Sequence, residues 1–159
     1  MQVALNNRLK KVTALVFASG GFVGFFPFAS GTWGSLVGVA MLWLTRDTGL
    51  VFQALMIVAL FIIGVWASGV TVKMLNQPDS SRIVIDEIVG MAITMYALPL
   101  TPYSLALGFF IFRFLDVLKP TPADWADSRL KGGLGVMADD VIAGIYGNLW
   151  MHFVLKTSF

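Results

Sequence analysis

An uncharged apolar run at Leu50–Val72 constrains the fold of this chain more than any other part of its sequence. The run, LVFQALMIVALFIIGVWASGVTV, is long enough to cross a lipid bilayer, which takes about 20 apolar residues. The whole chain is 57% hydrophobic and only 13% charged, whereas a soluble domain is about 45–50% apolar and about 25% charged. Lipid is therefore the expected solvent for much of the surface.

Other apolar runs on both sides of this one predict further membrane segments. They are Ser35–Leu44, Ile88–Leu98, Tyr103–Leu118 and Val136–Leu155. A further run, Val12–Phe26, is broken by three glycines and is predicted to be a re-entrant or interfacial segment. The pattern predicts a polytopic membrane helical bundle of about five to six helices, including this N-terminal segment, in a single domain over residues 1–159.

Basic residues between these runs predict an orientation in the membrane. Loops rich in lysine and arginine stay in the cytoplasm, which assigns residues 1–11, 73–85 and 119–135 to that side. Residues 45–49, residues 99–102 and the C-terminus are then outside. The assignment requires the chain from Val12 to Leu44 to cross the membrane a net single time.

Composition also excludes several kinds of chemistry. The chain has no cysteine, which rules out disulfides, thiolate metal sites and a cysteine nucleophile. Its net charge of +2 and the lack of a basic stripe argue against a nucleic-acid partner. The sole histidine, His152, has no second histidine to act as its acid or base partner. We expect it to be an interfacial or packing residue.

Five acidic residues lie at or just inside the predicted cytoplasmic ends of three apolar runs. They are Asp86, Glu87, Asp116, Asp139 and Asp140. A carboxylate at the centre of a bilayer costs at least about 2.5–3.5 kcal/mol, so acids in such segments indicate function. If the three segment ends converge, the carboxylates repel one another unless a cation lies among them. Carboxylate oxygens suit Mg²⁺, Mn²⁺ or Ca²⁺.

A purely structural explanation remains open for each acidic site. Asp86 and Glu87 would begin one helix, and Asp139 and Asp140 would lie in the first turns of another, where acids complement the helix dipole by about 0.3–1 kcal/mol each. Asp116 lies near the predicted C-terminal end of its helix, where the dipole disfavours it. It has Arg113 and Lys119 three residues away on either side as salt-bridge partners.

The same cations suggest a phosphate ligand. Arg113 and Lys119 flank an acid at the membrane surface, and Arg82 precedes Asp86 by four residues. Arginine binds phosphate in a bidentate way and lysine binds it as a point charge.

A second phosphate feature is the segment FPFASGTWGS, Phe26–Ser35. Pro27, Gly31 and the hydroxyl residues Ser30 and Thr32 predict a loop that enters a helix, with Ser30 or Thr32 as its N-cap. Free N–H groups at a helix start bind anions. The alternative is that Ser30 or Thr32 only caps the helix. Likewise, KGGLG at Lys131–Gly135 either lets the backbone approach a ligand or forms a flexible turn.

Four stretches of the chain, in their order and spacing, resemble the phosphatidylglycerophosphatase A family. They are PFASGTWGSL (Pro27–Leu36), RIVIDEIVGM (Arg82–Met91), FRFLDVLKPTP (Phe112–Pro122) and GGLGVMADDVIAG (Gly132–Gly144). The resemblance covers nearly the whole chain. Two positions depart from it: Ile85 replaces an aromatic residue found in some relatives, and Thr121 stands where tryptophan is common.

This resemblance implies an enzyme that removes the terminal phosphate of phosphatidylglycerophosphate with Mg²⁺ and leaves phosphatidylglycerol in the bacterial inner membrane. It implies an all-α bundle of about six helices and no protein partner. The family's acids correspond to Asp86, Glu87, Asp116, Asp139 and Asp140, which are expected to be catalytic and to hold the metal. Arg113, Lys119, Gly31 and Thr32 also match motif positions, and with Arg82 they are expected to bind the substrate phosphate.

Two rival functions use similar residues. A CDP-alcohol phosphotransferase would also place carboxylates and a metal at the membrane, but its expected D-G-x-x-A-R pattern is missing. An ion transporter would hold intramembrane acids along a path near the bilayer midplane rather than at one face.

Overall fold

The computed structural model describes residues 2–77, 80–123 and 129–157, and these ranges are helical without any strand. They contain six α-helices and one short 3₁₀ helix, η1. The elements are α1 (Gln2–Ala18), η1 (Val23–Phe25), α2 (Ser30–Leu44), α3 (Leu50–Leu75), α4 (Ile85–Thr94), α5 (Pro102–Leu118) and α7 (Gly132–Thr157). The predicted all-α bundle is confirmed.

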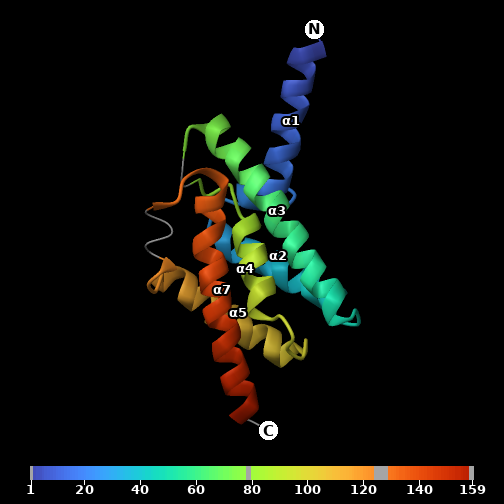
Figure 1. The fold of residues 1–159 in the computed structure, drawn as a ribbon, viewed down its shortest axis with the longest axis vertical. Coiled ribbons are helices and arrows are strands. Elements are labelled where there is room, and N and C mark those ends of the chain that lie inside the picture. Colours follow the sequence, from blue (N-terminus) through green and yellow to red (C-terminus); the bar gives the residue numbers. More distant parts are fainter. Residues whose placement is uncertain (1, 78–79, 124–128, 158–159) are drawn as a thin grey trace.

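The short helix α4 lies at the centre of the bundle (Figure 1). It packs against α2, α3, α5 and α7, and most of its side chains are buried. Its 10 residues rise about 15 Å, which is half of the roughly 30 Å hydrocarbon core of a bilayer. The run Ile88–Leu98, predicted as a membrane segment, therefore forms a buried core helix that is too short to cross on its own.

The chain ends and connections divide between the two ends of the bundle (Figure 1). The N-terminus and the α3–α4 connection lie toward one end, and the α2–α3 and α4–α5 connections and the C-terminus lie toward the other. This division agrees with the predicted grouping of residues 1–11 and 73–85 on one side and of residues 45–49, residues 99–102 and the C-terminus on the other. The third predicted cytoplasmic loop, residues 119–135, lies partly outside the described residues. The division arises because α1 and α2 together run the length of the bundle once, with a turn between them at Gly20 and Gly21, which both have positive φ.

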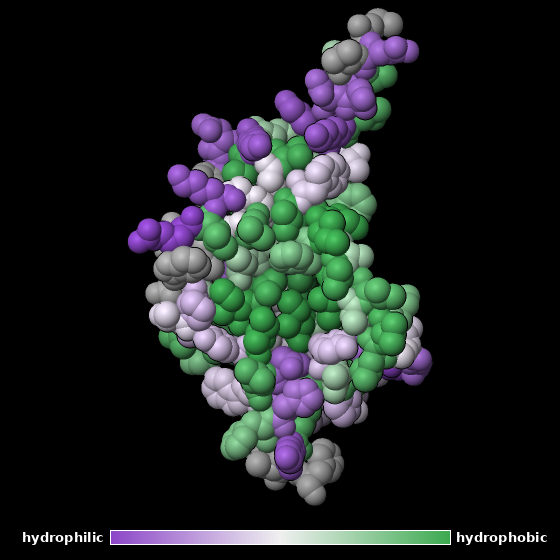
Figure 2. Space-filling view, in the orientation of Figure 1, coloured by the Kyte–Doolittle hydropathy of each residue, from purple (hydrophilic) through white to green (hydrophobic). Residues whose placement is uncertain are grey.

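The N-terminal segment differs from its prediction at both ends. Helix α1 begins at Gln2, ten residues before the apolar run Val12–Phe26, and ends at Ala18 within it. The apolar pattern missed the first half because that half carries Arg8, Lys10 and Lys11 on an exposed helix. Figure 2 shows hydrophilic side chains along the upper end of the molecule, where α1 lies.

Helix α3 is the one element, among the described residues, that is both long and apolar enough to cross a membrane. Most of its side chains remain on the surface, including Leu55, Val58 and Ile62. Figure 2 shows a broad apolar surface over the middle of the molecule, between hydrophilic groups at its ends. Large exposed apolar areas are rare on soluble monomers, so this surface is suited to lipid.

Glycines let α4 and α7 approach closely. A Cβ atom on Gly90 would lie 2.5 Å from the Phe112 ring and 2.9 Å from the backbone oxygen of Asp140, and one on Gly144 would lie 2.6 Å from the Gly90 oxygen. Small residues at such interfaces are typical of helices packed in membranes, where van der Waals contact replaces the hydrophobic effect. The packing of α4 on α7 also fixes the position of Asp140 along α4.

This packing predicts that Gly90→Ala destabilises the protein. The added methyl group would overpack the contact, at a cost of about 1–3 kcal/mol in the free energy of unfolding. Gly49→Ala is the matched control, because a Cβ there meets nothing within 4 Å. Unfolding of both variants in detergent measures the difference, and equal stability of the two would contradict the packing described.

Candidate active site

Two of the predicted acids begin α4. Asp86 and Glu87 lie in the first turn, and the Asp86 carboxylate accepts a hydrogen bond from the Glu87 backbone N–H at 3.1 Å. The start of α4 is tied to the end of α1, because the Val84 N–H donates to the Ala18 oxygen at 2.8 Å. The prediction that both acids begin a helix is confirmed, and the helix dipole favours them there.

Asp139 and Asp140 occupy a different place in their helix from the one predicted. Helix α7 begins at Gly132, so both acids lie seven or more residues inside it, and both are buried. The helix dipole acts mainly within the first turn and does not account for them.

The glycines before these acids belong to α7 itself. Gly132 has φ +66°, and a Cβ on Gly133 would collide with the Val65 oxygen and lie 2.7 Å from the Gly69 nitrogen on α3. The backbone at KGGLG therefore lies against the neighbouring helix α3. The sequence had suggested either a flexible turn or a close approach to a ligand at this segment.

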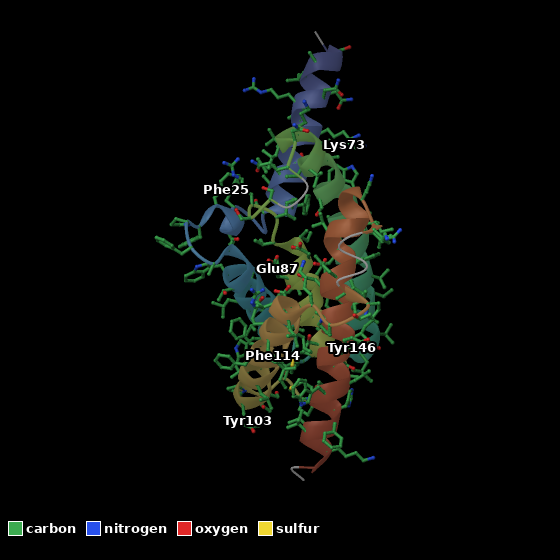
Figure 3. All side chains as sticks on the ribbon, turned by 90° about the vertical axis from the view of Figure 1, so that its left-hand side faces the viewer. Phe25, Lys73, Glu87, Tyr103, Phe114 and Tyr146 are labelled. Carbon is green, nitrogen blue, oxygen red and sulfur yellow. The ribbon has the colours of Figure 1, made fainter. Side chains whose placement is uncertain are left out.

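Three carboxylates form a compact cluster inside the bundle. One oxygen each of Asp86, Glu87 and Asp140 lies within 4.8 Å of the others. Figure 3 shows Glu87 in the interior of the bundle and Tyr103, near the start of α5, far from it. Asp139 adjoins Asp140 in α7, and Asp116 is near enough to Asp140 for its charge to act on that carboxylate.

The cluster suits a metal ion. The Glu87 Oε2 atom is buried and has no hydrogen-bond partner, although buried polar atoms are nearly always satisfied. Carboxylate oxygens are the preferred ligands of hard divalent cations. The described residues thus provide an acidic site that could hold a metal, with one ligand atom not otherwise engaged.

Two cations border the cluster. Arg113 forms an ion pair with Asp116 on α5, and the Lys119 Nζ lies 2.9 Å from the Asp139 Oδ2 on α7. The salt bridge that the sequence offered as an alternative for Asp116 is therefore present, with Arg113 as the partner. Helix α5 ends at Leu118, within one residue of the end predicted from the proline at position 120, and Lys119 caps it with φ 45°.

Charge counting supports a bound cation. Within the part of the chain that the structure describes, five ionised carboxylates and the two cations that border them sum to three negative charges, since 5 − 2 = 3, in a partly buried space. Like charges at such distances disfavour joint ionisation. A divalent ion would remove most of the excess.

The start of α2 completes the site. A Cβ on Gly31 would collide with Glu87 and lie 3.0 Å from the Arg113 Nη1. The N-cap is Ala29, with φ 49° and no side-chain cap, so the prediction of Ser30 or Thr32 as N-cap is wrong. The reason is that Ala29 has a left-handed backbone conformation. Its carbonyl oxygen accepts a hydrogen bond from the Thr32 N–H at 2.9 Å.

Other predicted residues have contacts elsewhere. The Arg82 side chain is exposed and lies over the Phe25 ring, 5.3 Å from its centroid. His152 is exposed on α7, about 18 Å along the helix from Asp140. The sequence analysis missed Gly90, which lets the Asp140 backbone lie against α4. A glycine four residues after Asp86 was the feature of the sequence that could have indicated this contact.

Comparison with known proteins agrees with this arrangement. The sequence profile of the phosphatidylglycerophosphatase A family matches residues 16–155. Phosphatidylglycerophosphatase A of Escherichia coli (strain K12) is 36% identical over 132 residues, which cover 82% of this chain and 77% of the relative. Phosphatidylglycerophosphatase A of Haemophilus influenzae (strain ATCC 51907) is 37% identical over 151 residues, covering 89% of this chain and 90% of the relative.

A third relative carries a different name. A Bacteroides thetaiotaomicron (strain ATCC 29148) protein, named as a candidate phosphatidylinositol-3-phosphatase, is 37% identical over 131 residues, covering 77% of this chain and 81% of the relative. No solved structure matches significantly. With the starts of α2 and α4, the end of α5 and an inner turn of α7 gathered around a cluster of carboxylates bordered by cations, and with these relatives along most of its length, the chain belongs to the phosphatidylglycerophosphatase A family and is a phosphatase.

Proposed function

We propose that this chain hydrolyses phosphatidylglycerophosphate to phosphatidylglycerol and phosphate with the help of Mg²⁺. The observation that carries the proposal is the compact group of the half-buried Asp86 and Glu87 with the buried Asp140, in which one buried Glu87 oxygen has no hydrogen-bond partner. The family relatives named for this activity support the choice of substrate.

In this proposal Asp86, Glu87 and Asp140 hold the metal, and Asp116 and Asp139 lie close enough to join them or to adjust the local charge. The donor set is all carboxylate, which fits Mg²⁺ better than softer metals. When bound, the ion would neutralise phosphate oxygens and activate water.

The substrate phosphate is assigned to the cations on α5. Arg113 pairs with Asp116 and lies against Gly31, where a guanidinium can offer two parallel hydrogen bonds to a phosphate. Lys119, held by Asp139, would add a point charge. Gly31 leaves room for this contact because it has no side chain. The predicted role of Arg82 has less support, since its side chain lies over the Phe25 ring. The contact described for Thr32 is a backbone hydrogen bond to Ala29, with no side-chain contact to the carboxylates among the described ones.

The proposed location is the bacterial inner membrane, as a multi-pass protein with its site at the cytoplasmic face. The apolar surface and α3 support contact with lipid. Glu87 lies in the first turn of α4, which follows the α3–α4 connection at the end of the bundle that holds the basic helix α1, and positive segments stay in the cytoplasm.

Phosphate release by purified protein in lipid–detergent micelles tests this proposal. We expect release from phosphatidylglycerophosphate to require Mg²⁺ and to stop with EDTA. Asp140→Asn should lower kcat/KM at least about a hundredfold, because it removes one metal ligand and its charge.

Asp47→Asn is the matched control, since the side chain of Asp47 is 89% exposed in the α2–α3 connection. Full activity of Asp140→Asn, or release that EDTA does not change, would refute the metal site. Faster release from phosphatidylinositol 3-phosphate than from phosphatidylglycerophosphate would refute the proposed substrate.

A second experiment isolates the phosphate contact. Arg113→Lys keeps the charge but loses the planar fork, so we expect kcat/KM to fall by about ten- to a hundredfold through misplacement of the phosphate. Arg46→Lys, at an exposed arginine that stacks on Trp43, should leave activity unchanged. Equal activity of the two variants would remove Arg113 from phosphate binding.

A further inference from the structure

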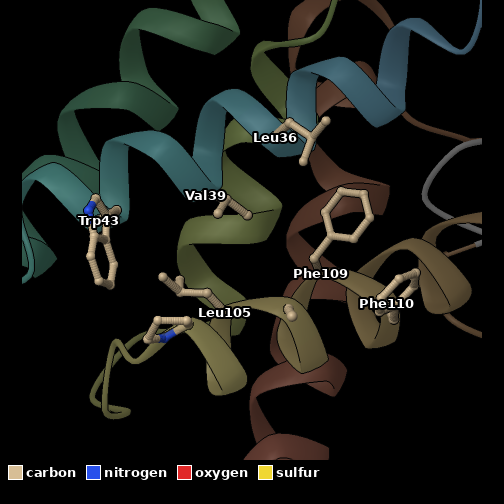
Figure 4. A pocket seen from close by; sticks show the side chains of 8 residues that line it. Leu36, Val39, Trp43, Leu105, Phe109 and Phe110 are labelled. Carbon is tan, nitrogen blue, oxygen red and sulfur yellow. The ribbon is translucent and has the colours of Figure 1, made fainter.

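An apolar groove runs between α2 and α5. Its volume is about 480 Å³, and its walls include Leu36, Val39 and Trp43 on α2 and Pro102, Ala106 and Phe109 on α5. Figure 4 shows the two helices side by side, with Leu36 near Phe109 at one end and Trp43 at the other. We call this the α2–α5 groove. The mechanism proposed above does not use it.

One end of the groove adjoins the candidate active site. Gly31 begins α2 and lies beside Arg113 near the end of α5. Leu36 follows Gly31 by five residues, and Phe110, another groove residue, precedes Arg113 by three, which is less than one helical turn. The two helices therefore lead from the phosphate-binding groups directly into an apolar channel.

The distance from Arg113 to the far end of the groove is close to the thickness of one bilayer leaflet. Arg113 and the groove residue Pro102 are eleven residues apart on α5, which is about 16 Å along the helix axis. Half of a hydrocarbon core of roughly 30 Å is about 15 Å. The volume also lies within the range of about 300–1,000 Å³ that is usual for pockets holding small molecules.

The rim of the groove is accessible from the surface. Trp43 is 39% exposed, Leu36 is 40% exposed and Phe110 is 69% exposed. A chain lying in the surrounding lipid could enter sideways without leaving an apolar environment. The groove residues named here have apolar side chains apart from the Trp43 indole N–H, so a charged occupant has no ion-pair partner among them.

We propose that the α2–α5 groove binds an acyl chain of the phospholipid whose phosphate is bound at Arg113. This inference rests on the proposed function and adds the apolar half of the substrate site. An acyl chain gains little binding affinity from the hydrophobic effect when it moves from the bilayer into the groove, since lipid tails are as apolar as the groove walls. Its role is to fix the position of the lipid, so that the phosphate meets the carboxylate cluster in a reactive orientation.

Narrowing the groove tests this role. Ala106 is an exposed groove alanine, and Ala106→Trp would obstruct the channel about 10 Å along α5 from Arg113. Ala59→Trp is the matched control, at an exposed alanine of α3 outside the groove. Both variants are assayed with phosphatidylglycerophosphate carrying sixteen-carbon chains and with the same lipid carrying short, six-carbon chains.

We expect Ala106→Trp to lower kcat/KM for the long-chain lipid at least about tenfold and to change that for the short-chain lipid less than about twofold. Ala59→Trp should match the wild type on both. Unchanged long-chain activity of Ala106→Trp, or an equal loss on both lipids, would overturn the proposal.

Photolabelling of the wild type separates this inference from the proposed function. Phosphatidylglycerophosphate with a diazirine near the end of one acyl chain should label α2 and α5 groove peptides, and unlabelled lipid should compete. Equal labelling of α3 would mean that only bulk lipid contacts the groove, and would overturn the inference. If wild-type protein releases no phosphate from either lipid, the proposed function fails, and the labelling pattern still decides the groove.

Discussion

The mutual repulsion of clustered carboxylates is the constraint on which this structure depends. One oxygen each of the half-buried Asp86 and Glu87 and the buried Asp140 lies within 4.8 Å of the others in an apolar bundle, where like charges disfavour joint ionisation. Arg113 and Lys119 balance two neighbouring acids but leave the central cluster without a direct ion pair in the described contacts. A fold that brings these groups together is explained most simply by a cation that belongs among them.

The close packing of the helices brings these carboxylates together. Gly31, Gly90 and Gly133 lie where a side chain would strike a neighbouring helix or a site residue, so each sets how closely two elements approach. The helix α4 carries Asp86 and Glu87 and is enclosed by the others, which places the two acids in the interior although they begin a helix. The same arrangement leaves the α2–α5 groove beside Arg113, so that polar and apolar parts of one site share two helices.

Much of this could be predicted from the sequence because it depends on local patterns. The apolar run starting at Leu50 gave the start of α3, and the proline at position 120 gave the end of α5. The acids were found by their cost in an apolar environment. What failed depends on tertiary contacts: the start of α7 at Gly132 is set by contact with α3, the N-cap at Ala29 by its left-handed backbone, and the Lys119–Asp139 pair by two distant segments. None of these three features leaves a periodic pattern of apolar residues in the sequence.

The most direct test of the central claim is the binding of Mn²⁺, a paramagnetic substitute for Mg²⁺, followed by electron paramagnetic resonance in detergent. This measurement does not depend on the identity of the substrate. The account predicts that wild-type protein and Asp47→Asn bind Mn²⁺, that Mg²⁺ displaces it, and that Glu87→Gln weakens binding by at least about tenfold. Equal Mn²⁺ binding by Glu87→Gln and wild type, with both proteins folded, would contradict a metal site in the carboxylate cluster.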